Sequence, residues 1–205
     1  MNKTLKYFLI ALCAVGGLFL IGFIIMVLMI GFAFGSFDKG YSVSELKEEY
    51  YSKEVEIKEL VNYYNTIKPK NCSVDIEFKN DKILERLTVI SKDSSNEIIY
   101  QEWDINSNVL QTEKLKNLVG WSEREITGLK SKLDQANCIS IEEGEPLKIG
   151  FKRSGMGMFS FNIFQEARTN RDEYNNNCEY ILVNKYLALQ YGGGAIGPQC
   201  FPDKN

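Results

Sequence analysis

The sequence predicts an α+β protein, in which one N-terminal transmembrane helix precedes a small domain with a mainly antiparallel sheet and about three helices. Three observations support this prediction. Residues 7–37 contain no charged side chain. Further along, short stretches of strand-forming residues are separated by turn sequences rich in Gly, Asn and Pro. Helical and strand patterns occur in mixed blocks without regular alternation, which argues against a doubly wound sheet.

The uncharged segment 7–37 is long enough to cross a membrane. As a helix, its 31 residues would extend about 46 Å, against about 30 Å for the hydrocarbon core. A cleavable signal peptide has an apolar region of only about 7–15 residues, so we expect an uncleaved signal anchor embedded in membrane lipid. Lys3 and Lys6 precede the segment. They favour residues 1–6 in the cytoplasm and the domain outside, in the periplasm or the extracellular space.

Residues 38–70 are expected to form a membrane-proximal amphipathic helix. From residue 41 to residue 67, apolar residues follow a 3-4 spacing that is broken once, at Lys53. Ser42 and Glu45 form a capping box at its start. The spacing suits a short coiled coil, but we favour a helix that packs on its own domain, because Lys53 and the Tyr positions would weaken a dimer seam.

A homodimer is one hypothesis about partners. It would form through the membrane-proximal helix or through Gly31 and Gly35, a GxxxG pair of the kind that membrane-helix interfaces use. The simpler explanation of the pair is that Gly is abundant in membrane helices.

Residues 71–205 are expected to fold as the α+β domain. Short helices are predicted over 110–119 and from a capping box at Ser122 and Glu125 to about residue 136. Trp103 and Trp121 are expected in or near the core. No internal repeat is visible. Strand patterns cover residues 74–78, 83–90, 98–105, 138–141, 147–151, 158–164, 180–183 and 186–191.

Four cysteines of the domain are disulfide candidates: Cys72, Cys138, Cys178 and Cys200. An even number in an exported domain implies two bridges, with three pairings open. We favour Cys178–Cys200 and Cys72–Cys138. The alternative is that some are buried, reduced thiols in a domain that faces the cytoplasm. The wide spacings and the lack of a CxxC pair argue against a zinc site.

The composition restricts the chemistry. The chain has no His, which removes the usual general base at neutral pH and the commonest zinc ligand. The net charge is −3 and there is no long basic stretch, so nucleic acid is not an expected partner. We identify no catalytic, cofactor-binding or metal-binding residues. Whether the protein is an enzyme stays open, with a non-enzyme favoured.

Two local clusters are candidate sites. Lys152, Arg153 and Met156 surround a Gly-rich turn and would form a contact loop, with an ordinary hairpin tip as the alternative. Three acidic residues near a turn are expected to be a solvated edge rather than an acid–base pair: Glu142, Glu143 and Glu145.

Three stretches carry a family resemblance: LKSKLDQANCISIEEGEP, GFKRSGMGMFSF and YILVNKYLALQYGGGAIGPQCF. They resemble a group of uncharacterised small membrane-tethered or lipoprotein-like proteins of Bacteroidota. The resemblance covers the C-terminal half of the chain, from Leu129 onward. It implies a location in the bacterial envelope, and it implies neither an activity nor any functional residue.

The expected function is that of a membrane-anchored, extracytoplasmic interaction or accessory domain with a protein partner in the envelope. Two alternatives stay open. One is an exported enzyme that works without His, and the other is a cytoplasm-facing domain with functional thiols.

Overall fold

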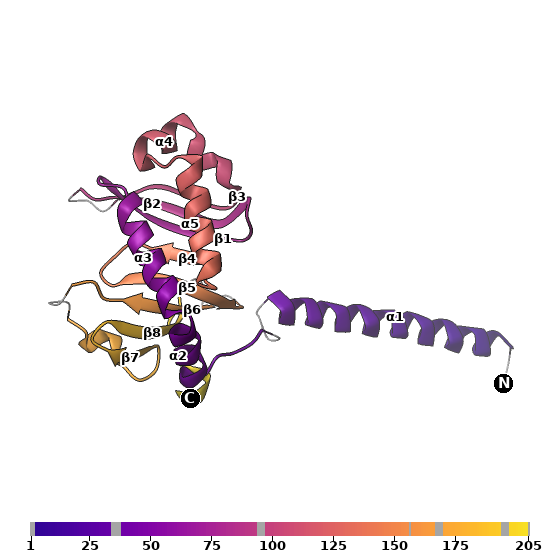
Figure 1. Cartoon of the computed structure of the whole chain (residues 1–205). Helices are drawn as coiled ribbons and strands as arrows, with labels where there is room; N and C mark the ends of the chain where they lie inside the picture. Colours follow the sequence, from indigo (N-terminus) through magenta and orange to yellow (C-terminus); the bar gives the residue numbers. More distant parts are fainter. Residues whose placement is uncertain are drawn as a thin grey trace. The chain divides into compact units, whose positions relative to one another are not determined.

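The computed structural model describes residues 3–33, 38–93, 97–155, 157–166, 170–193 and 197–204. The chain divides into two compact units, Met1–Lys39 and Gly40–Asn205 (Figure 1). We describe each unit by itself.

The first unit is the helix α1 (Lys3–Ala33). Within it, Val15–Phe32 is long and apolar enough to cross a membrane, and none of this stretch is buried. The predicted apolar helix is therefore confirmed as a candidate span. Gly35, the second residue of the GxxxG pair, lies outside the described residues, so that hypothesis stays a prediction.

The second unit is an α+β domain with one antiparallel sheet, as predicted. The strands follow the order β3-β2-β1-β4-β5-β6-β8-β7 across the sheet. The α-helices are α2 (Val43–Ser52), α3 (Glu54–Ile67), α4 (Glu113–Val119) and α5 (Glu123–Gln135). Short 3-10 helices are η1 (Ser107–Gln111), η2 (Asp172–Tyr174) and η4 (Pro202–Lys204). The strands are β1 (Cys72–Phe78), β2 (Ile83–Ser91), β3 (Ile98–Asn106), β4 (Ser140–Glu142), β5 (Leu147–Ser154), β6 (Gly157–Ile163), β7 (Tyr180–Asn184) and β8 (Leu187–Gly192).

The described part of the domain has four α-helices where about three were expected, because the predicted helix over residues 41–67 is interrupted at Lys53. The backbone of Lys53 leaves the helical region, with φ −120° and ψ 17°. Its N–H donates to the carbonyl of Tyr50 at 3.1 Å, and its carbonyl accepts from the N–H of Ile57 at 2.8 Å. Lys53 thus ends α2 and begins α3, at the position where the apolar spacing breaks.

Both predicted capping boxes are present. Ser42 caps α2 and Ser122 caps α5. In each box the serine side chain accepts from the N–H of a glutamate three residues on, Glu45 or Glu125, whose carboxylate accepts from the serine N–H. Each box satisfies backbone donors that the first turn of a helix leaves open.

The apolar side chains of α2 and α3 are buried in the core of their own domain, as favoured over a coiled coil. They are Val43, Leu46, Tyr50, Ile57, Leu60 and Tyr64. Because these side chains already have partners, they cannot also form the seam of a coiled coil.

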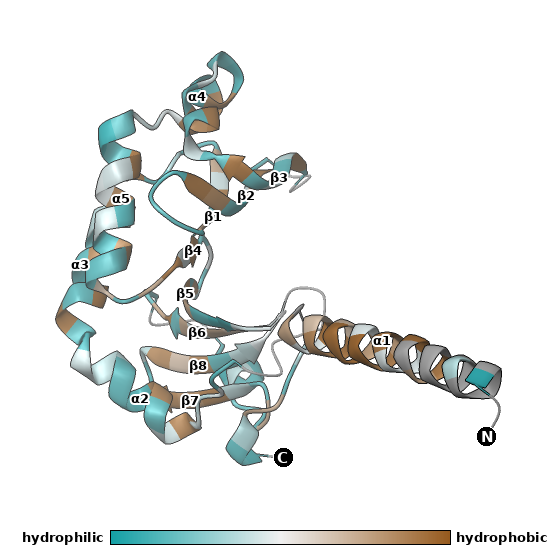
Figure 2. Ribbon diagram, turned by 90° about the vertical axis from the view of Figure 1, so that its right-hand side faces the viewer, coloured by the Kyte–Doolittle hydropathy of each residue, from teal (hydrophilic) through white to brown (hydrophobic). Residues whose placement is uncertain are grey.

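Strand register sorts side chains onto two faces of the sheet. One row crosses all eight strands and is apolar in seven of its members: Glu102, Leu87, Ile76, Ile141, Ile149, Phe161, Leu189 and Ile181. Helices α2, α3 and α5 cover this face (Figure 2). Side chains alternate along a strand, so the neighbouring positions point to the opposite face. Among the residues of the domain that the structure describes, no α-helix covers that face, which we call the polar face (Figure 2).

The topology contains an architectural repeat that the sequence does not reveal. A helix followed by three antiparallel strands occurs twice, as α3-β1-β2-β3 and as α5-β4-β5-β6. β1 pairs with β4 at the centre, and each set of strands continues outward from there.

Candidate functional site

One of the two expected disulfides is present. Cys178 and Cys200 are bonded. The bond joins the segment before β7 to the C-terminal segment, where the N–H of Phe201 also donates to the carbonyl of Cys178 at 3.1 Å. The C-terminal segment is therefore held to the sheet both covalently and by a hydrogen bond.

The expected Cys72–Cys138 bridge is wrong, because both residues are free, buried cysteines. Cys72 begins β1, whereas Cys138 lies beyond the other end of β1, since Ser140 pairs with Glu77. At about 3.3 Å per strand residue the two are roughly 20 Å apart, whereas a bridge needs Cα atoms about 4.4–6.8 Å apart.

The two free thiols of the domain are in environments that disfavour the reactive thiolate form. Burial raises the pKa of the Cys138 thiol to about 12 and also raises the pKa of Cys72. A reactive cysteine needs the opposite shift, because the thiolate is the nucleophile. Neither thiol is poised for chemistry at neutral pH.

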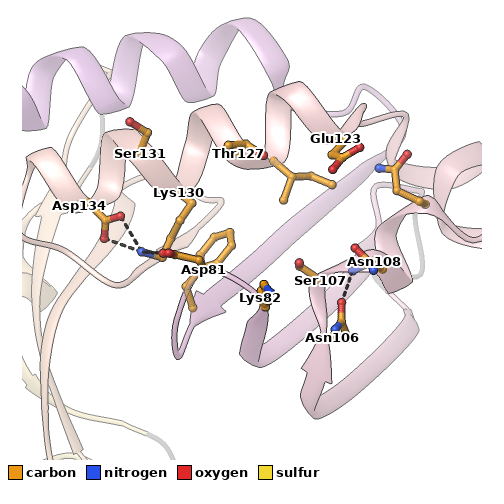
Figure 3. Close-up of a pocket in the computed structure, with 13 residues that line it drawn as sticks. Asp81, Lys82, Asn106, Ser107, Asn108, Glu123, Thr127, Lys130, Ser131 and Asp134 are labelled. Atoms are coloured by element: carbon orange, nitrogen blue, oxygen red, sulfur yellow. Dashed lines mark hydrogen bonds and ion pairs between the residues drawn. The ribbon is translucent and has the colours of Figure 1, made fainter.

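A cleft of about 610 Å³ lies beside α5 (Figure 3). Its α5 wall presents Glu123, Thr127, Lys130, Ser131 and Asp134. Residues three and four apart share one face of a helix, so this spacing aligns all five side chains along the cleft. The helix places polar groups here because its opposite face is buried in the core.

The opposite wall comes from segments far away in the sequence. Asp81 and Lys82 lie in the turn between β1 and β2, and Ser107 and Asn108 lie in η1. The N–H of Ser107 donates to the carbonyl of Lys82 at 2.8 Å, which joins the two parts of this wall. The apolar floor, Phe78 and Ile126, is almost fully covered.

One end of the cleft is held by a lysine between two carboxylates. Lys130 Nζ lies 2.6 Å from Asp134 and 3.2 Å from Asp81 (Figure 3). Burial lowers the pKa of Lys130, but its hydrogen bonds with Asp134 and Asp81 outweigh burial and raise the pKa overall. Lys130 therefore stays charged and joins α5 to the β1–β2 turn.

The polar face is the second candidate surface. One of its rows crosses all eight strands: Trp103, Arg86, Glu77, Ser140, Gly150, Ser160, Gln190 and Tyr180. Trp103 is 58% exposed on an edge strand, so the expectation that it lies in or near the core is wrong, whereas Trp121 is buried. Near the centre, Arg86 contacts Glu142 at 2.7 Å, and Lys148 lies 3.5 Å from the same carboxylate.

Asp75 is the perturbed acid of the polar face. It pairs with Glu142 across β1 and β4. Burial, and then the charge of Glu142, raise the pKa of Asp75 to about 6, against the opposing effects of Arg86, Lys148 and the backbone N–H of Glu143. A like-charged neighbour directly opposite disfavours ionisation.

The expected acidic edge is not solvated as predicted. The side chains of Glu142 and Glu143 are only 24% and 13% exposed. Glu143 accepts from Lys92 at 2.6 Å and from the hydroxyl of Tyr64 at 3.1 Å. Glu145 accepts from the backbone N–H of Gln165 at 3.0 Å. All three carboxylates are structural partners of other segments.

Two residues of the expected contact loop, Lys152 and Arg153, have different partners in the structure. Arg153 points onto the polar face and is ion-paired with Glu77, whose hydrogen bond raises the pKa of Arg153. Lys152 Nζ lies 5.7 Å from the ring centre of Phe151. Met156 lies outside the described residues.

The cleft was not predicted from the sequence, although one of its two walls has a recognisable sequence pattern. The polar spacing along α5 can be read from the sequence, but the opposite wall cannot, because turn packing positions it.

Among the described residues, no group of three or more acidic or cysteine side chains is placed to hold a metal ion. No family model matches this chain, and no curated protein sequence or solved structure matches it either.

Proposed function

We propose that the protein is a single-pass membrane protein that holds a ligand-binding domain on the oxidising side of the membrane. The observation that carries the proposal is the exposed apolar surface of α1. Leu18, Phe19 and Met29 are 71%, 81% and 67% exposed, and none of Val15–Phe32 is buried. An apolar surface of this extent needs lipid or a partner to cover it.

The disulfide supports the compartment. Structural disulfides persist in oxidising compartments and are rare where thiols are kept reduced. Cys178 and Cys200 are bonded, and the two lysines before the apolar run favour a cytoplasmic N-terminus. Both arguments support a domain outside the cytoplasm.

The cleft beside α5 supports binding as the role of the domain. Its volume of about 610 Å³ lies in the range of small-molecule sites. Side chains from α5, the β1–β2 turn and η1 converge there (Figure 3). The ordered framework of these elements provides a fixed site for a ligand.

Substituted-cysteine labelling tests the topology. Glu48→Cys introduces a thiol at an exposed position of α2, and Asn2→Cys introduces one in the N-terminal segment. A membrane-impermeant maleimide should label Glu48→Cys in right-side-out vesicles and Asn2→Cys in inside-out vesicles. The unmodified chain is the control, because Cys72 and Cys138 are buried and Cys13 lies within the apolar helix α1, which the proposal puts in the membrane. Labelling with the reverse sidedness, or a chain found in the soluble fraction, would refute the proposal.

A further inference from the structure

The cleft beside α5 carries hydrogen-bonding groups that the protein itself does not use. Within the described part of the chain, the side chains of Ser107, Asn108 and Thr127 have no hydrogen-bond partner in the protein, and the Glu123 carboxylate has none either. Figure 3 shows Glu123 and Thr127 on the α5 side, with Ser107 and Asn108 on the opposite side. A ligand between the walls would meet two hydroxyls, an amide and a carboxylate.

The charges of the cleft disfavour an anionic ligand. Asp81, Glu123 and Asp134 bring three carboxylates, against the two ammonium groups of Lys82 and Lys130. Lys130 is already held by Asp81 and Asp134. A phosphate or carboxylate ligand would gain only Lys82 and would be repelled by the excess negative charge.

The floor of the cleft disfavours an apolar ligand. Phe78 is 4% exposed and Ile126 is 7% exposed. A site for a lipid or an aromatic molecule is lined mainly by accessible apolar side chains. Here only Phe78 and Ile126, of the thirteen residues that line the cleft, have apolar side chains, so the floor offers only a small apolar contact.

We infer that this cleft binds a neutral, hydroxyl-rich ligand, that is, a saccharide. A sugar hydroxyl both donates and accepts, so it can pair with the hydroxyls of Ser107 and Thr127 and with both ends of the Asn108 amide. The Glu123 carboxylate can accept from adjacent hydroxyls, and a charge-assisted hydrogen bond is stronger than a neutral one. The inference names the ligand class of the site proposed above, so it rests on that proposed function.

Glycan binding by the full chain in lipid nanodiscs tests the inference. The probe is an array of immobilised neutral and acidic oligosaccharides, followed by calorimetric titration with the best-bound neutral oligosaccharide. We expect retention on neutral glycans. Asn108→Ala and Thr127→Val should each weaken the affinity roughly tenfold, as the loss of one or two good hydrogen bonds would. Both positions are exposed, so both variants should keep their fold, which circular dichroism checks.

Ser44→Ala is the matched control, since it removes an exposed hydroxyl on α2, outside the lining of the cleft. Its affinity should equal that of the unmodified chain. Failure to bind any neutral glycan, preference for acidic glycans, or equal affinity of all three variants would overturn the inference. Correct labelling sidedness with no glycan binding would remove this inference alone. Glycan binding with reversed sidedness would instead remove the proposed membrane topology.

Discussion

Arg153 on β5 reaches across the short strand β4 and donates two hydrogen bonds to the carboxylate of Glu77 on β1. The Nη2–Oε2 distance is 2.7 Å. The Glu77 side chain is only 2% exposed, whereas that of Arg153 is 37% exposed. The pair joins the two halves of the architectural repeat on the polar face.

Removing Arg153 should be costly, because it leaves the Glu77 carboxylate buried without its cation. We expect Arg153→Met to lower the free energy of unfolding by about 3 kcal/mol. The double variant with Glu77→Gln should recover much of that loss. Urea unfolding of the full chain in detergent micelles measures both values in a double-mutant cycle. Lys152→Met, at the neighbouring cation, should change stability little. Strict additivity of the Glu77 and Arg153 substitutions would contradict the expected coupling.

Asp75 should make stability fall as pH rises from about 4 to about 6. The pKa of Asp75 is raised to about 6 in the folded protein, above about 3.9 in an unfolded chain. Its stabilising contribution is therefore full below pH of about 4 and is lost as pH rises through about 6.

Asp75→Asn should remove this dependence. The variant should be more stable than the unmodified chain at pH 7.5, by on the order of 2 kcal/mol, and the difference should vanish near pH of about 4. Urea unfolding across this pH range measures the effect. Asp172→Asn is the control, because Asp172 is an exposed aspartate in η2. Parallel stability curves for Asp75→Asn and the unmodified chain would show that Asp75 is not perturbed.

The Cys178–Cys200 bond should contribute about 3 kcal/mol to stability, because it closes a loop with a sequence separation of 22 and restricts the unfolded chain. A reductant should lower the thermal midpoint of the unmodified chain. It should have no further effect on the double variant Cys178→Ala, Cys200→Ala. If the reductant shifts both proteins equally, the stabilisation does not come from this bond.

Gly128 on α5 makes room for Tyr63 on α3. A Cβ at Gly128 would clash with the Tyr63 hydroxyl oxygen and would lie 2.8 Å from Cζ. That hydroxyl donates to the carbonyl of Glu125 at 3.1 Å. The two helices can approach here because Gly128 has no side chain.

The sign of the effect of Gly128→Ala should depend on Tyr63. In the unmodified chain the clash should outweigh the better helix propensity and lower stability by about 1–2 kcal/mol. In a Tyr63→Ala background the same substitution should raise stability by up to about 1 kcal/mol, as in an open helix. Thermal unfolding of the four chains gives the comparison. The same sign in both backgrounds would rule out the proposed close approach.

The local elements of this protein follow from the sequence alone. The apolar helix, both capping boxes and all eight strands were predictable, because each depends on residues within one or two turns or along one strand. The break at Lys53 was also visible in the spacing. Its outcome as two separate helices is seen only in the backbone of Lys53, which leaves the helical region.

The contacts between segments far apart in the sequence depend on strand pairing. The even number of cysteines in the domain favoured a bridge between Cys72 and Cys138. The register of β1 and β4 instead puts these two residues at opposite ends of one strand. The same register brings Arg153 close to Glu77. Sequence periodicity determines which face a residue occupies. Only the tertiary fold decides which distant segments meet on that face, because register is set by the packing of the whole sheet.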